Sequence, residues 1–139
     1  MTTEDLFKVK INDDDAENSA VTAYKKNNLQ IESKIKLIES LYEGILVFNA
    51  NIIKAINDNE IELKVDWVNR STAVFIELMN ALDLDSEGTI AEYLNNLYAQ
   101  QLKYLREANK DNDIAKVKLV NNVVIGLLDA WRETNEIDQ

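Results

Sequence analysis

The chain has 139 residues, of which 46% are apolar and 29% are charged, the size and balance of one globular domain with a single core. Its formal net charge of −10 repels phosphate backbones and anionic lipid surfaces, so nucleic acids and membrane surfaces are poor partners and a polypeptide with basic or apolar segments is a better one. The absence of Cys and His excludes disulfides, thiolate nucleophiles, zinc–cysteine sites and the Glu-x-x-His pairs of di-iron bundles, so we expect no enzyme active site and no cofactor.

The first 19 residues are predicted to form a flexible acidic tail. Asp13, Asp14 and Asp15 stand among scattered apolar side chains that are too few to be buried. No apolar run of about 7–15 residues follows a basic start, and no later stretch reaches the roughly 20 apolar residues of a membrane span. We therefore expect a cytoplasmic protein whose single domain covers residues 20–136 and begins with a short helix at residues 20–27.

The first long helix is predicted over residues 33–56, with Ser33 as its N-cap. Its apolar residues recur at spacings of three and four, as Ile35, Ile38, Leu41, Tyr42, Ile45, Ile52, Ile53 and Ile56. The polar connection at residues 57–60 is short, so a second helix over residues 61–84 must turn back antiparallel to the first. Its predicted core stripe is Ile61, Val65, Val68, Thr72, Phe75, Ile76, Met79 and Leu82.

Two further helices complete the predicted fold. The third has its apolar stripe between Ile90 and Ala108, the fourth between Val117 and Trp131, and the polar residues 109–113 connect them. The chain has no Pro and only 3 Gly, which favours helices over strands and loops. The fold predicted is all-α, an antiparallel up-down four-helix bundle with a short N-terminal helix or cap.

Residues 83–90 look like a calcium-binding loop, because oxygen-bearing side chains alternate before Gly88 at the sixth position. Leu94, however, stands at the twelfth position, where a bidentate carboxylate should complete the coordination. We therefore predict an ordinary turn between helices here and no metal site. Glu39 and Glu43, one helical turn apart, are interpreted as charges on a solvent-facing surface.

The second helix carries another apolar stripe besides its core stripe, formed by Leu63, Trp67, Val74 and Leu78. Two interpretations stay open: the stripe packs against an adjacent helix, or it lines a groove for a partner's amphipathic helix or extended peptide. Aromatic and apolar residues at the borders of the stripes on the third and fourth helices are further candidates for lining such a groove. The candidate groove residues are Leu63, Trp67, Val74, Leu78, Tyr93, Tyr104 and Leu119.

Short motifs in a particular order resemble those of the flagellin-specific export chaperones, the FliS family. Residues 21–24 read Val-Thr-Ala-Tyr, and residues 41–45 read Leu-Tyr-Glu-Gly-Ile, similar to the family's Leu-Tyr-Asp-Gly-Ala. Residues 88–98 are similar to its Gly-Glu-Ile-Ala-x-x-Leu-x-x-Leu-Tyr segment, and residues 105–109 to its Leu-x-x-Ala-Asn. Residues 130–132, Ala-Trp-Arg, stand where the family has its closing Ala-Trp-basic signature.

The resemblance implies a four-helix bundle that binds the disordered C-terminal segment of flagellin one to one. Such a chaperone prevents premature polymerisation and delivers flagellin to the type III export gate. By the same resemblance, Val21 and Tyr24 form a cap that covers the groove in the free protein and helps docking at the gate; the alternative is a small packed N-terminal helix with no partner. Three departures are the acidic extension before Val21, a missing Pro before the first helix, and Glu87 in place of a Gly.

The partners expected are flagellin, an export gate component and a co-chaperone or regulator, with the chain itself a monomer. A second class of function is an adaptor that recognises another export component through the same bundle. The only enzyme class that stays open is a hydrolase in which carboxylates hold a metal ion, because the chain lacks the Cys and His residues that other catalytic sites commonly use.

Overall fold

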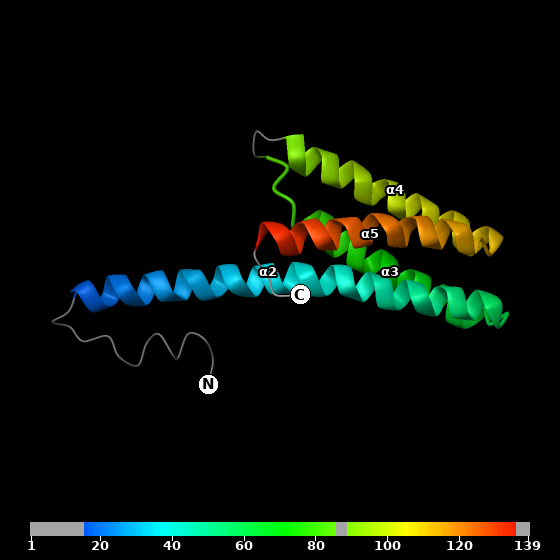
Figure 1. The fold of residues 1–139 in the computed structure, drawn as a ribbon, viewed down its shortest axis with the longest axis horizontal. Helices are drawn as coiled ribbons and strands as arrows, with labels where there is room; N and C mark the ends of the chain where they lie inside the picture. Colours follow the sequence, from blue (N-terminus) through cyan, green and yellow to red (C-terminus); the bar gives the residue numbers. More distant parts are fainter. Residues whose placement is uncertain (1–15, 86–88, 136–139) are drawn as a thin grey trace. The chain divides into compact units, whose positions relative to one another are not determined.

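The computed structural model describes residues 16–85 and 89–135, and in these residues it contains helices and turns but no strand. Figure 1 shows the helices in chain order: α2 (Ala16–Asn57), α3 (Ile61–Asn80), α4 (Thr89–Asp111) and α5 (Ile114–Thr134). The all-α class is therefore confirmed. The predicted tail up to residue 15, with its three aspartates, and residues 86–88 of the calcium-like loop lie outside the described residues.

Helix α2 is one continuous helix over residues that were expected to form two. The break expected at residues 28–32 is absent, and Ser33 lies inside the helix instead of capping it. No Gly or Pro occurs before Gly44 in this helix, and Asn27 and Asn28 lower helix propensity by only a few tenths of a kcal/mol more than most residues do. Two asparagines are thus too weak a signal to end a helix.

The turns between α2 and α3 and between α4 and α5 are short and polar. Asn59, between α2 and α3, has a φ of 55°, and Asn112, between α4 and α5, has a φ of 53°. Asparagine is among the few residues that adopt this left-handed conformation readily. Asp113 then caps α5, because its side chain accepts a hydrogen bond from the backbone N–H of Lys116.

The chain divides into two units, Met1–Leu37 and Ile38–Gln139, and the hydrophobic core belongs to the second. In that unit α3 contacts α4, and α4 contacts α5. The core side chains are Ile38, Tyr42, Ile45, Ile52, Val68, Phe75, Leu78, Tyr98, Leu105, Ala108, Val117, Val120, Val124 and Leu128. These contacts are consistent with a helical bundle.

Buried polar side chains also join the helices of the second unit. The Ser71 hydroxyl of α3 donates to Asn49 Oδ1 of α2 at 2.7 Å, and Asn49 Nδ2 donates to Asn121 Oδ1 of α5 at 2.9 Å. The hydroxyls of Tyr42 in α2 and Tyr98 in α4 are hydrogen-bonded at 2.6 Å. Residues 38–57 of α2 thus have a polar contact with each of the other three helices.

The face that α3 buries differs from the predicted one. Its buried residues are Lys64, Val68, Ser71, Phe75 and Leu78, whereas Ile61 and Ile76 are exposed. The buried stripe has the spacing 4, 3, 4, 3 of a helix face, but two of its members are polar. The predicted stripe is confirmed at Val68 and Phe75, but it missed the buried polar residues Lys64 and Ser71.

Candidate functional site

A pocket between α2 and α3 contains two of the predicted groove residues. Leu63 and Trp67 of α3 line it together with Asn51 and Lys54 of α2 and Asp58 and Glu60 of the turn between them. We call it the α2–α3 pocket; its volume is about 200 Å3. Concave sites lined by apolar and aromatic side chains with a few polar groups are typical of binding sites.

Trp67 is held in place by ring contacts on the α2–α3 face. Its ring centroid lies 5.7 Å from that of Phe48, with the ring planes 33° apart, and the Arg70 guanidinium carbon lies 4.8 Å from the Trp67 ring. The indole also packs in part against the core. A half-buried, pre-positioned aromatic ring of this kind loses little conformational entropy when it contacts a partner.

The rim of the α2–α3 pocket combines apolar and charged groups. Leu63 is 46% exposed. Lys54 and Asp58 form an ion pair at 2.9 Å, and the hydrogen bond that the Lys54 ammonium donates to Asp58 raises the pKa of that ammonium. A pocket whose lining combines apolar and charged side chains can receive an apolar side chain of a polypeptide and orient the backbone beside it.

The other predicted groove residues do not line this pocket. Leu78 is buried in the core, and Val74 and Tyr104 pack in part against it. Tyr93 of α4 and Leu119 of α5 are exposed. The structure thus brings Leu63 and Trp67 together, while helix packing accounts for Val74 and Leu78.

The predicted cap residues lie on α2 within the first unit. Val21 is 49% exposed and Tyr24 is 67% exposed. They are three residues apart on a helix, so their side chains share one face.

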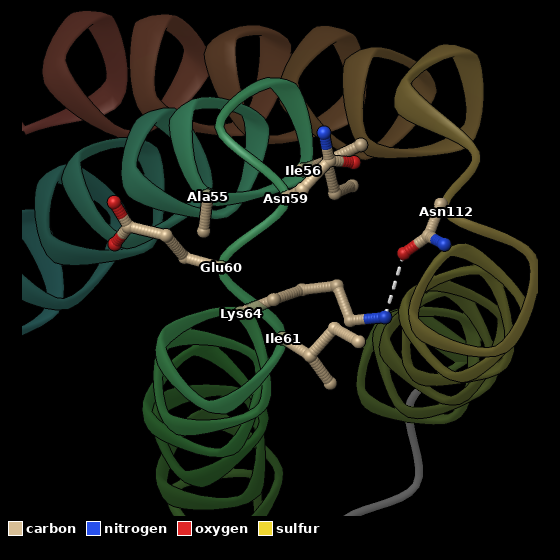
Figure 2. Close-up of a pocket in the computed structure, with 7 residues that line it drawn as sticks. All are labelled: Ala55, Ile56, Asn59, Glu60, Ile61, Lys64 and Asn112. Atoms are coloured by element: carbon tan, nitrogen blue, oxygen red, sulfur yellow. Dashed lines mark hydrogen bonds between the residues drawn. The ribbon is translucent and has the colours of Figure 1, made fainter.

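A second, smaller pocket was not predicted, and we call it the end pocket. Figure 2 shows its lining residues, which include Asn59, Glu60, Lys64 and Asn112, with the Lys64 ammonium directed at the Asn112 side chain. Lys64 was overlooked because lysine is normally exposed. Its position four residues before Val68 on the buried stripe was the signal that could have found it.

Glu39 and Glu43 of α2 pair with Arg132 of α5 instead of facing solvent alone. Arg132 Nε lies 2.8 Å from Glu39 Oε2, and Arg132 Nη2 lies 3.2 Å from Glu43 Oε1. Their partner is 89 or more residues away in the sequence, so no local pattern could reveal it. Across residues 16–85 and 89–135, no group of three acidic side chains is placed to hold a metal ion, and no helix is long and apolar enough to span a membrane.

Comparison with known proteins gives a consistent result. Residues 16–138 match the family model described as flagellar protein FliS. The flagellar secretion chaperone FliS of Campylobacter jejuni is 48% identical over 118 residues, which cover 85% of this chain and 92% of that protein. The proteins of the same name from Escherichia coli and Bacillus subtilis are 29% and 26% identical, covering 73% and 81% of this chain and 76% and 83% of theirs.

Proposed function

The chain belongs to the FliS family of flagellar secretion chaperones, and on this premise we propose that it is a cytoplasmic chaperone for flagellin. It binds the disordered C-terminal segment of flagellin, prevents premature polymerisation and delivers flagellin to the flagellar type III export gate. The observation that carries the proposal is the 48% identity to a flagellar secretion chaperone across 85% of the chain. The family is one of chaperones, not of enzymes.

Binding is proposed to occur by coupled folding of the client on the chaperone surface. An unfolded segment with apolar residues at helical spacing gains burial when it enters a groove, and this gain offsets the entropy lost on ordering. The α2–α3 pocket supports this mechanism because Leu63 offers exposed apolar surface and Trp67 is already held by Phe48 and Arg70. An apolar client side chain would fill it as an anchor.

The full client surface is proposed to extend beyond this pocket. Tyr93 and Leu119 contribute exposed side chains, and Val74 and Tyr104 contribute half-buried ones. Leu78 belongs to the core in the free chain, so a substitution there would act first on stability. Val21 and Tyr24 are proposed as the cap over the client surface and as a docking point for the export gate.

We further propose that the helices form an antiparallel up-down bundle. Lys64, near the start of α3, donates to the backbone of Asn109, near the end of α4. Asn121 of α5 contacts Asn49 of α2, while Arg132, later in α5, contacts Glu39, earlier in α2. When the residue numbers of successive contacts increase along one helix and decrease along the other, the two helices are antiparallel neighbours.

The organisation proposed with this function is a single chaperone domain over residues 20–136 behind an acidic tail over residues 1–19, of which residues 16–19 form the first turn of α2. The chain acts as a monomer and binds one flagellin molecule. A gate component and a co-chaperone or regulator are proposed as further partners.

The test is titration calorimetry of the C-terminal segment of flagellin into the full chain. We expect Trp67→Ala to weaken binding about tenfold or more and Leu63→Ala to weaken it less, because a buried aromatic anchor carries more binding energy than an aliphatic rim residue. Ile125→Ala is the matched control, since Ile125 is as exposed as Leu63 but lies on α5 and does not line the pocket.

Thermal unfolding of each variant separates lost affinity from lost folding, because Trp67 also packs against the core. Because Leu63 is exposed, Leu63→Ala should fold normally, so it can still test the pocket if Trp67→Ala unfolds. Unchanged affinity in both variants would remove the α2–α3 pocket from the client surface, and absence of binding by the unmodified chain would overturn the function itself.

A further inference from the structure

The end pocket adjoins the α2–α3 pocket, and the two share Ala55 and Glu60 in their linings. The end pocket has a volume of about 80 Å3 and lies where the turn before α3 meets the turn before α5 (Figure 2). A polypeptide that occupies the α2–α3 pocket therefore has this smaller pocket next to it.

Lys64 gives the end pocket its chemistry. The residue is only 6% exposed, and its ammonium donates to the backbone oxygen of Asn109 at 2.7 Å and to Asn112 Oδ1 at 2.6 Å. Both acceptors are uncharged. An ammonium group has three N–H donors, so one of them is left for another acceptor.

Among the residues that the structure describes, no carboxylate forms an ion pair with Lys64. The ion pairs formed by the described residues involve other cations, namely Lys54, Lys116 and Arg132. The backbone oxygen of Asn109 stands near the C-terminal end of α4, which supplies a partial negative charge. A buried ammonium whose positive charge meets only a partial negative charge is unfavourable, so an anion that binds beside it is stabilised.

A carboxylate matches the size and the donors of this pocket. The volume of about 80 Å3 exceeds the roughly 10–15 Å3 that one water molecule needs by the same measure, so the pocket has room for one carboxylate group. Its oxygens can accept from the remaining N–H of Lys64 and from Asn112 Nδ2, since Asn112 already uses its Oδ1 to accept from Lys64. Charge-assisted hydrogen bonds of this kind are the stronger ones.

We infer that the end pocket binds the free α-carboxylate at the C-terminus of the client polypeptide. The inference rests on the proposed function, in which the client segment is the C-terminal one and its apolar side chains occupy the adjoining α2–α3 pocket. The pocket would then fix where the client chain ends and so set the register of the bound segment.

Glu60 is the competing occupant, because it lines both pockets and carries a carboxylate of its own. The two possibilities differ in their response to Glu60→Gln. If the client carboxylate binds Lys64, removing the Glu60 charge removes a repulsion and binding becomes tighter. If Glu60 itself turns toward Lys64, the substitution removes the counter-charge and lowers the stability of the free chain, with no gain in affinity.

The experiment compares two synthetic peptides of the flagellin C-terminal segment, one with a free C-terminal carboxylate and one with a C-terminal amide. Titrated into the full chain, the free carboxylate should bind about tenfold more tightly, the effect of one hydrogen bond to a charged group. Equal affinity of the two peptides would overturn the inference and leave the proposed function standing. Binding of neither peptide would overturn both.

Two variants test whether Lys64 causes the difference in affinity between the two peptides. Lys64→Met keeps an unbranched side chain but no charge, and it should bring the affinities of the two peptides together. Asn112→Asp places a carboxylate of the chain itself beside Lys64. It should abolish the preference for the peptide with a free carboxylate while preserving the fold. This variant can therefore still test the assignment if Lys64→Met unfolds. A preference for the free carboxylate that persists in Asn112→Asp would contradict the assignment.

Discussion

Tyr42 and Tyr98 meet inside the core with their hydroxyls 2.6 Å apart. Burial raises the pKa of the Tyr42 hydroxyl, although the hydrogen bond with Tyr98 acts in the opposite direction. Burial also raises the pKa of the Tyr98 hydroxyl, and the hydrogen bond with Tyr42 adds to it. Both side chains therefore stay protonated in the folded chain at a pH where an unfolded tyrosine, with a pKa of about 10, ionises.

This pair predicts a loss of stability in alkaline solution. Below about pH 10 both states hold the phenolic protons and the pair contributes no pH dependence. Above it the unfolded chain releases protons that the folded chain retains, so the free energy of unfolding falls, by up to about 1.4 kcal/mol per pH unit for each tyrosine. Urea unfolding between pH 8 and 11 measures the slope.

The control is the double variant Tyr42→Phe with Tyr98→Phe, in which both hydroxyls are removed and neither is left unpaired. It should unfold with a shallower dependence on alkaline pH than the unmodified chain. Identical slopes would mean that the two hydroxyls do not stay protonated in the folded state.

Helix α2 is continuous because one side-chain period runs along its whole length. The buried positions Ile38, Tyr42, Ile45, Asn49 and Ile52 are spaced by four and three residues. The same spacing continues toward the N-terminus through Ile35, Ile31, Asn28, Tyr24 and Val21. A period of this kind favours one helix over two, since a break would shift the stripe to another face.

Two glycines lie inside helices with free space around them. A Cβ added to Gly44 of α2 or to Gly126 of α5 would meet no atom within 4 Å beyond the neighbouring residues and the backbone of its own helix. Neither residue has a positive φ. Each glycine therefore lowers helix stability without a packing benefit within the chain.

Replacing either glycine by alanine should raise the free energy of unfolding by about 1 kcal/mol, the difference in helix propensity. Chemical denaturation of Gly44→Ala and Gly126→Ala measures the gain. Ala99→Gly, at an exposed position of α4, should lose a similar amount and serves as the reverse control. A destabilised alanine variant would show that the position needs glycine for a reason other than space.

At the scale of the molecule, charged pairs join helices that are distant in sequence. Arg132 of α5 binds Glu39 and Glu43 of α2, and Lys116 of α5 binds Glu107 of α4 at 2.6 Å. The hydrogen bond that Glu107 accepts from Lys116 lowers the pKa of the Glu107 carboxyl. The Arg132 pairs matter more for the bundle, because they join the first and last helices of the unit Ile38–Gln139.

Arg132→Gln should lower the melting temperature by less than a core truncation such as Val124→Ala, since the pairs are only partly buried and charges that water still reaches interact weakly. The loss should shrink at high salt, where the charges are screened. Thermal unfolding at low and high salt measures both effects. Lys54→Gln, which breaks only an exposed pair between the last turn of α2 and the residue that follows the helix, is the control and should change little. A loss that does not depend on salt would assign the role of Arg132 to packing.

The sequence by itself determined the helical class, the positions of most helices and the family. These properties depend on local propensity and on the order of short motifs, such as Leu-Tyr-Glu-Gly-Ile at residues 41–45, which can be read without knowing what each residue touches. Leu63 and Trp67 were predicted to share an apolar stripe in the same way, and both line the α2–α3 pocket; their role as client contacts stays a prediction. The end of α3 was placed four residues late, since helix ends depend on weak local signals.

Only the tertiary structure decided which face each helix buries and which charges meet. Lys64 lies on the buried face of α3 because the end of α4 supplies acceptors for its ammonium. Arg132 meets Glu39 because α2 and α5 are neighbours. Such pairings join residues far apart in the sequence, so they exist only once the helices have packed, and an apolar pattern assigns polar side chains to the wrong face.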